Sequence, residues 1–266
     1  MSETVPKGSE LQPESDAVLG RELAYYENLY STYGPSLFAQ AAVVLFRKYL
    51  VGRILRATGV GAESRILSIG CGIGDTELLL APHVAHLTGV DLSPTAVVEA
   101  RRVALAGSVT NVQFIAGSWQ TSTLAEQPFD AVVAIFFLHH LPDVDLAAFP
   151  VQLLRLLRPG GAFYSLDPSA RRLSGFLGQL LVPKLMDKYQ TEDERQLLPR
   201  STAAPFQAAG FDAKTHWFDF TSTPLAGLFP SWATGYRLAR GLDDALTRAP
   251  LLRELSSNFE LIARKP

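Results

Sequence analysis

Hydrophobic and polar positions follow two different periods along the middle of the chain. Short apolar runs occur at 65–69, 86–91, 112–117, 129–136 and 162–167, and apolar residues recur at helical spacing between them. The run at 129–136 is continuously apolar, which is typical of a central parallel strand that is buried on both faces. Strands that alternate with helices in this way predict a doubly wound α/β sheet with right-handed crossovers.

The rest of the chain predicts helices and two further strands. An aromatic, helical segment precedes the alternation, and helical insertions follow it at 171–200 and 222–255. Further strands are expected at 212–220 and 257–264. We therefore expect a mostly parallel, seven-stranded sheet with N-terminal helices and with helical insertions that form a lid.

The domain organisation follows from the same pattern. Residues 1–18 are polar and contain prolines, so we expect a disordered tail. Residues 19–266 are expected to form a single domain, in which 19–62 is an N-terminal helical cap. We see no internal repeat and no long low-complexity linker.

Composition and charge narrow the classes of partner. The chain has 266 residues, of which 47% are hydrophobic, and a formal net charge of −2. That charge offers no cationic field for a polyanion, so we expect no nucleic-acid partner. Cys71 is the only cysteine, which excludes an internal disulfide and fits a reducing compartment. No apolar run approaches the ~20 residues of a membrane span, so we expect no stable membrane insertion and a cytoplasmic protein.

A glycine-rich loop follows the first predicted strand. In "RILSIGCGIGDTELLL", Gly70, Gly72 and Gly74 lie between a strand and the expected start of a helix at Asp75. Such a loop lets a ligand approach the backbone at a helix N-terminus, and a dinucleotide or S-adenosylmethionine are the two common ligands. The dinucleotide fingerprint G-x-G-x-x-G would need glycine at position 75. A carboxylate there would repel a phosphate, which favours S-adenosylmethionine.

This stretch resembles motif I of the class I S-adenosylmethionine-dependent methyltransferases. Four further stretches resemble the later motifs of that family in the correct order, and together they cover about 64–167: "LTGVDLSP", "VQFIAGSW", "FDAVVAIFFLHHLPD" and "LLRLLRPGGAFYSLDPS". They are most similar to the subgroup typified by ubiquinone and menaquinone biosynthesis methyltransferases, which acts on small molecules. The resemblance implies a Rossmann-like methyltransferase fold, S-adenosylmethionine as cofactor and S-adenosylhomocysteine as product.

The resemblance also implies a set of cofactor-binding residues. The loop glycines would cradle the amino-acid part of the cofactor, Asp91 would accept two hydrogen bonds from the ribose hydroxyls, and Leu92 would touch the adenine. Ser118 departs from the family, which often has an acid at that place, and Trp119 either shields the adenine or belongs to the core. The implied residues are Ser68, Gly70, Cys71, Gly72, Gly74, Asp91, Leu92, Ser118, Trp119, Ile135 and Phe136.

Candidate catalytic residues lie at the ends of two later strands. Methyl transfer from a sulfonium is an in-line displacement, so alignment supplies much of the catalysis and a base is needed only when the nucleophile carries a proton. His139 and His140 follow the fourth strand and have a suitable intrinsic pKa for such a base, although histidines at this place in the family are often structural. Asp167 ends the fifth strand and is a second candidate. No metal site is predicted.

Aromatic and apolar residues outside the shared sheet are candidates for the acceptor pocket. Ordinary core packing explains most of them singly, whereas together they suggest a hydrophobic acceptor such as a quinone, an isoprenoid or another secondary metabolite. These candidates are Tyr25, Tyr26, Tyr30, Tyr33, Phe176, Leu180, Phe229, Trp232 and Tyr236.

Two other functions stay open at this point. The chain could bind S-adenosylmethionine without transferring its methyl group, or it could be a nicotinamide-dependent oxidoreductase, which Asp75 disfavours. The expected partner is a small-molecule acceptor, and the N-terminal and lid helices are candidate contacts for a homo-oligomer. The sequence does not say whether oxygen, nitrogen or carbon is methylated.

Overall fold

The computed structural model describes most of the chain from residue 39 onward. The described residues are 20, 21, 23, 24, 27, 28, 30, 36, 39–120, 124, 128–175 and 195–266. The predicted tail at 1–18 and much of the first predicted insertion, 176–194, lie outside this description. The division of the chain into one domain with a helical cap therefore stays a prediction.

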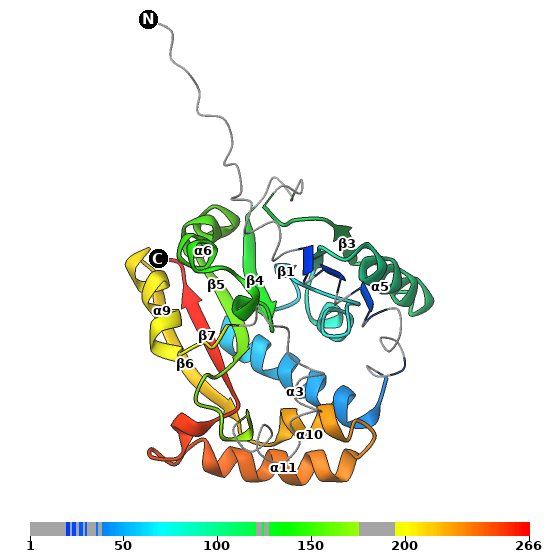
Figure 1. The fold of residues 1–266 in the computed structure, drawn as a ribbon. Coiled ribbons are helices and arrows are strands. Elements are labelled where there is room, and N and C mark those ends of the chain that lie inside the picture. The colour runs from blue at the N-terminus through cyan, green and yellow to red at the C-terminus, as the bar shows by residue number, and fades with distance from the viewer. Residues whose placement is uncertain are drawn as a thin grey trace, which may run out of the picture.

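A seven-stranded sheet forms the centre of the molecule (Figure 1). Its strands are β1 (Arg65–Ile69), β2 (His86–Asp91), β3 (Val112–Ala116), β4 (Phe129–Ile135), β5 (Leu157–Pro168), β6 (Asp212–Asp219) and β7 (Asn258–Arg264). They lie in the order β3-β2-β1-β4-β5-β7-β6. β7 is antiparallel to β5 and β6, and the other pairs are parallel, which confirms the mostly parallel sheet. The chain reverses its direction of winding between β1 and β4, where sheets of this kind bind ligands at their carboxyl edge.

Helices cover both faces of the sheet. They are α3 (Ala41–Thr58), α4 (Glu77–Leu80), α5 (Pro94–Ala106), α6 (Asp143–Leu156), α9 (Pro199–Ala208), α10 (Ser222–Leu228) and α11 (Ala233–Leu246), with short 3₁₀ turns at Ala81–His83, Leu138–His140 and Arg253–Leu255. One buried cluster joins the sheet to α6 and α9, and another joins it to α3, α10 and α11. Among the described helices, none combines the length and apolar character that crossing a bilayer requires.

Two helix boundaries lie where local chemistry predicts them. Gly59 has a left-handed φ of +73° and ends α3, as a glycine that follows a helix commonly does. The Ser93 hydroxyl accepts a hydrogen bond from the amide of Ala96 at 3.0 Å, and Pro94 occupies the first turn of α5. The sequence therefore fixes both ends through the residues themselves.

Two other boundaries differ from the prediction. The helix expected to begin at Asp75 begins at Glu77, because Gly74 has a φ of +76° and the chain is still turning there. The fifth strand was expected to begin at 162 but begins at Leu157. The amide of Gly160 donates to the carbonyl of Lys265, the residue after β7, at 3.1 Å. This pairing extends β5 toward its N-terminal end, through residues 159–161 that the sequence predicted as a turn.

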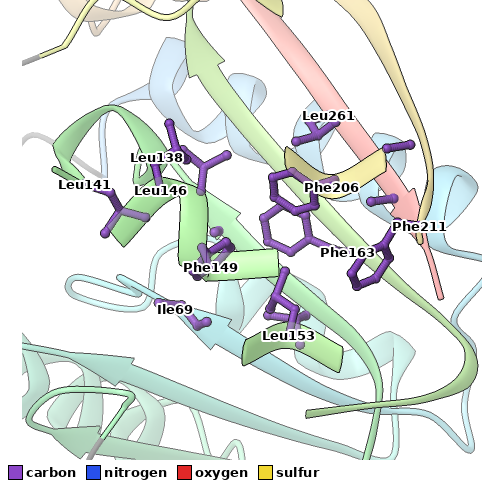
Figure 2. Close-up of a cluster of buried hydrophobic side chains, with 14 of the residues drawn as sticks. Ile69, Leu138, Leu141, Leu146, Phe149, Leu153, Phe163, Phe206, Phe211 and Leu261 are labelled. Carbon is purple, nitrogen blue, oxygen red and sulfur yellow. The ribbon is translucent and has the colours of Figure 1, made fainter. Parts of the chain in front are cut away.

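Aromatic rings dominate the core on the α6 and α9 face (Figure 2). Phe149 of α6 is buried, and its ring lies 5.5 Å from that of Phe163 on β5 and 6.2 Å from that of Phe206 on α9, centroid to centroid. Its ring also contacts Phe137 at 6.1 Å, in the loop that follows β4. This single side chain therefore joins two helices, the sheet and the edge at which ligands bind.

We expect Phe149→Ala to lower the free energy of unfolding by about 3–5 kcal/mol, because it removes a fully buried ring from four aromatic contacts. Urea denaturation followed by circular dichroism measures this. Val144→Ala on the exposed side of the same helix is the control and should change stability by less than about 0.5 kcal/mol. A loss of less than about 1 kcal/mol for Phe149→Ala would contradict the packing described here.

Candidate active site

The glycine loop is held against the carboxyl end of β2. The amides of Gly70 and Cys71 both donate to the carbonyl of Val90, at 2.8 and 3.2 Å. Gly70 has a φ of +69°, and a Cβ at this position would lie 2.8 Å from the ring of Phe137. A side chain at position 70 would therefore be strained by both backbone conformation and contact, which leaves glycine as the residue that fits.

Asp91 links this loop to the start of α5. Its carboxylate accepts hydrogen bonds from the amide of Gly72 at 2.7 Å and from the amide of Ser93 at 2.9 Å. Burial raises the pKa of Asp91, and the two backbone hydrogen bonds oppose that shift. Leu92, the next residue, exposes its side chain beside this corner. The structure thus brings the predicted loop and the predicted ribose-binding residue into direct contact.

Two residues of the N-terminal segment lie against the same corner. Glu27 accepts hydrogen bonds from the hydroxyl of Ser93 at 2.5 Å and from the amide of Thr95 at 3.3 Å, and these bonds lower its pKa. The hydroxyl of Tyr30 lies 2.6 Å from the place that a Cβ of Gly72 would occupy. Tyr30, predicted for the acceptor pocket, therefore lies against the glycine loop. Glu27 was missed, because nothing in its local sequence distinguishes it from a solvated helical glutamate.

His139 and Asp167 form a buried pair at the ends of β4 and β5. Nδ1 of His139 lies 3.0 Å from a carboxylate oxygen of Asp167. An ionised carboxylate can only accept, so this contact places the proton on Nδ1 and leaves Nε2 as the basic atom. The ring of His140 lies 3.9 Å from that of His139, centroid to centroid. All three residues were predicted as catalytic candidates from the sequence, and they lie together in the structure.

A strained residue precedes this pair. Phe136 has a φ of +53°, which is uncommon for a bulky side chain, and its amide donates to the carbonyl of Leu166 at 2.7 Å. That bond ties the end of β4 to β5 just before Asp167. Backbone strain of this kind concentrates at functional sites, where the surrounding structure holds it. Phe136 and Ile135, predicted near the cofactor, pack toward the cluster around α3.

A buried carboxyl group lies beneath the glycine loop. Glu77 accepts a hydrogen bond from the hydroxyl of Ser68 at 2.6 Å, and its other oxygen is buried with no hydrogen-bond partner among the described residues. Asp75 lies nearby and pairs with Arg47 of α3 at 2.5 Å. Burial, and secondly the charge of Asp75, raise the pKa of Glu77 to about 7. The sequence singled out Ser68 but not its partner, which becomes a neighbour only when α4 folds back on β1.

The other predicted cofactor residues have mixed surroundings. Trp119 packs edge to face on Phe149 at 5.3 Å, as a partly buried member of the core cluster, and Ser118 accepts a hydrogen bond from the amide of Gln120. Cys71 is buried, and burial raises the pKa of its thiol, which disfavours a nucleophilic role. The roles of Ser118 and Trp119 in binding a cofactor stay predictions.

The predicted acceptor residues are only partly placed. Tyr25, Tyr26, Tyr33, Phe176 and Leu180 lie outside the described residues. Phe229 and Trp232 are each more than half exposed and pack edge to face, with ring centroids 6.2 Å apart. Tyr236 is buried beside α3, and burial raises its pKa. These positions do not by themselves define a pocket.

Comparison with known proteins identifies the central part of the chain. Residues 66–161 match the family model described as a methyltransferase domain. This segment runs from β1 into β5. This part of the chain is therefore similar to a methyltransferase domain. The match covers the glycine loop, Asp91 and the paired histidines, which agrees with the resemblance of the sequence motifs and removes the support for a nicotinamide-dependent oxidoreductase.

Curated relatives of this part of the chain carry methyltransferase names. The chain is 32% identical over 117 residues to "Uncharacterized methyltransferase YcgJ" of Bacillus subtilis, covering 44% of this chain and 46% of that protein. It is 32% identical over 156 residues to a ubiquinone biosynthesis O-methyltransferase of Xylella fastidiosa, covering 55% of this chain and 60% of that protein. The chain thus spans about half the length of these curated relatives.

Solved structures confirm the fold around the methyltransferase domain. Magnesium protoporphyrin IX methyltransferase from Synechocystis, solved with bound S-adenosylhomocysteine, superposes with a TM-score of 0.63 at 14% identity. The match covers 93% of this chain and 100% of that one. At this level of identity the likeness shows the Rossmann-like methyltransferase fold and no more.

We expect Glu77→Gln to change how stability depends on pH. The pKa of about 7 in the folded protein lies above that of an unfolded glutamate, so the folded state binds more protons between these values. The free energy of unfolding therefore falls as pH rises from about 4 to about 7, on the order of 3 kcal/mol, and then levels off. Glutamine stays neutral, so the variant lacks this loss.

Urea denaturation at a series of pH values measures the difference between wild type and variant. Glu63→Gln is the control, because Glu63 is exposed on the turn before β1 and should leave the difference flat. A difference that does not change between pH 4 and pH 7 would show that Glu77 has the same pKa in the folded and the unfolded protein, against the burial described above.

Proposed function

We propose that this methyltransferase domain transfers a methyl group from S-adenosylmethionine to a small, hydrophobic acceptor that carries a titratable proton. The observation that carries the proposal is the buried His139–Asp167 pair at the carboxyl edge of the sheet, next to the glycine loop. The two are linked through Phe137, whose ring packs on Gly70 and which lies two residues before His139. A base and a cofactor loop are thereby held side by side.

The residues at the loop fit the cofactor. Gly70, Gly72 and Gly74 each have a left-handed φ, which lets the loop turn tightly against the carboxyl end of β2, beside Asp91. The carboxylate of Asp91 already accepts two backbone hydrogen bonds, but its two oxygens offer about four acceptor sites, so ribose hydroxyls can still bind it. When bound, S-adenosylmethionine supplies an electrophilic methyl group on a positively charged sulfur. The methyltransferase relatives and the neighbour solved with S-adenosylhomocysteine support this choice.

The His139–Asp167 pair favours an acceptor that loses a proton. With Nδ1 of His139 facing Asp167, Nε2 carries the lone pair of the ring, and the carboxylate of Asp167 stabilises the imidazolium that forms when Nε2 takes up a proton. Such a pair suits a hydroxyl or amine nucleophile, which loses its proton as it attacks the methyl group, whereas a carbon–carbon double bond attacks without losing a proton and needs a base only for the carbocation that follows. O-methylation, which the quinone-pathway relative performs by name, is therefore the reaction that this geometry supports best.

The chemistry around the site supports a hydrophobic acceptor. The amide of Ala42 on α3 donates to the carbonyl of Pro230 at 2.8 Å, which brings the segment with Phe229 and Trp232 to the start of α3. Arg47 of the same helix pairs with Asp75, next to the glycine loop. Exposed aromatic side chains at the start of that helix suit a flat or prenylated acceptor. The role of the lid and N-terminal helices in a homo-oligomer also stays a proposal.

We expect Asp91→Ala to weaken binding of S-adenosylmethionine at least about tenfold, because it removes charge-assisted hydrogen bonds to the ribose. Isothermal titration calorimetry with S-adenosylmethionine and with S-adenosylhomocysteine measures this. Asp212→Ala, an exposed change on edge strand β6, is the control and should bind normally. An unchanged dissociation constant in a folded Asp91→Ala protein would remove Asp91 from the site.

We expect His139→Ala to lower kcat about 10²- to 10⁴-fold without changing the affinity for S-adenosylmethionine, since general-base catalysis contributes a factor of this size. Turnover of a panel of phenols and catechols, followed by release of S-adenosylhomocysteine, measures kcat. Asp167→Asn should act in the same direction and alter the pH profile, because the amide cannot stabilise the imidazolium. If His140→Ala alone abolished turnover while His139→Ala did not, the base would be His140.

A further inference from the structure

Helix α11 turns its apolar side outward. Leu238 is 70% exposed and Leu242 is 54% exposed, and Ala245 continues the same stripe one turn later. In Figure 1 this helix lies along the outside of the molecule, next to α10. A helix on the surface of a globular protein normally points such a stripe at the core. The outward position of these leucines therefore needs an explanation.

Polar contacts on the inner side of α11 hold this orientation. Arg240 is buried with its guanidinium 4.5 Å from the ring centroid of Tyr49 on α3 and 5.6 Å from that of Phe218 on β6. Asp243 is fully buried and accepts hydrogen bonds from the amides of Thr221 and Ser222, at 3.0 and 2.8 Å, where α10 begins. Rotating the helix to bury its leucines would break these contacts of Arg240 and Asp243.

The apolar surface extends beyond the helix at both ends. Eight of the fifteen large hydrophobic side chains that are exposed in the described residues fall between 228 and 255. They are Leu228, Phe229, Trp232, Leu238, Leu242, Leu251, Leu252 and Leu255. Leu251 is 91% exposed, and Trp232 and Phe229 precede the helix as an edge-to-face pair. Apolar side chains gathered in this way mark an interaction surface.

The charges beside this surface are basic. Arg237 is exposed on a flank of the leucine stripe of α11, and Arg248 is exposed in the turn that follows the helix. No ion pair joins either of them to another described residue. The nearby acids are already paired, Asp244 with Arg240 at 3.0 Å and Glu254 with Arg171 at 3.0 Å. The flank therefore carries uncompensated positive charge.

We propose that the outward face of α11 and the turn after it, defined by Leu238, Leu242, Ala245, Arg237 and Arg248, docks on the surface of an anionic lipid membrane. Exposed leucines with arginines beside them, and with tryptophan and phenylalanine before the helix, are features of a helix that lies in a bilayer interface. A second copy of this chain fits less well, because the face presents no free carboxylate to the partner's arginines, whereas anionic lipid head groups supply that charge.

This docking goes beyond the proposed methyl transfer and can be tested without it. Docking would bring the segment with Phe229 and Trp232 to the membrane, where a lipophilic acceptor is concentrated. The measurement is cosedimentation of the full chain with vesicles of phosphatidylcholine alone and with vesicles of equal parts phosphatidylcholine and phosphatidylserine. Neither methyl donor nor acceptor is present, so a failure of the proposed reaction leaves this result unaffected.

We expect wild-type protein to sediment with the anionic vesicles and to stay in solution with phosphatidylcholine alone. Leu238→Ser/Leu242→Ser and, separately, Arg237→Gln/Arg248→Gln should each lower the partition coefficient at least about tenfold. All four side chains are exposed, so both variants should fold, and unchanged circular dichroism checks this. Leu105→Ser, at an exposed leucine on α5, is the matched control and should bind like wild type.

Three results would overturn the proposal. One is wild-type protein that does not sediment with the anionic vesicles. Another is vesicle binding that both double variants retain in full. The third is a dimer, seen by sedimentation equilibrium, that Leu238→Ser/Leu242→Ser dissociates, because the face would then belong to a contact between two copies.

Discussion

The corner between the glycine loop and the second strand depends on one carboxylate. Asp91 accepts hydrogen bonds from the amides of Gly72 and Ser93, so it holds the loop after β1 and the first turn of α5 at the same time. Without it, two backbone donors at a partly buried position would lose their partner, and such groups are costly to leave unsatisfied. The position of the glycine loop relative to the start of α5 follows from this arrangement.

A second polar arrangement fixes the C-terminal helices on the sheet. Glu260 is buried on β7, where it accepts a hydrogen bond from the hydroxyl of Tyr164 on β5 at 2.5 Å and pairs with Arg53 of α3. Arg240 of α11 packs on the ring of Tyr49, which lies on α3 one turn before Arg53. Buried ionic groups contribute little net stability but penalise alternative packings strongly, because breaking one pair leaves a charge uncompensated. This explains how α11 can keep its leucines in solvent.

The candidate site contains two acidic side chains with different surroundings, Asp167 and Glu77. Asp167 lies against a histidine and can stabilise a positive charge on that ring, which suits proton transfer. Glu77 lies beneath the loop with a hydroxyl partner and a neighbouring carboxylate. Burial raises its pKa to about 7, so the group is partly protonated at neutral pH. A carboxyl group whose pKa is raised by burial beside a ligand loop is typical of sites where protons or charged ligands move.

The sequence by itself determined the strand–helix alternation, the glycine loop, Asp91, and the presence of His139, His140 and Asp167 at strand ends. These depend on local patterns: apolar period, backbone freedom at glycine and the order of motifs. Tertiary structure alone decided that β7 enters between β5 and β6, that Glu27 and Tyr30 lie on the glycine loop, and that α11 faces outward. Each of these brings together residues far apart in the chain, and their pairing depends on packing and polar partners that no local pattern records.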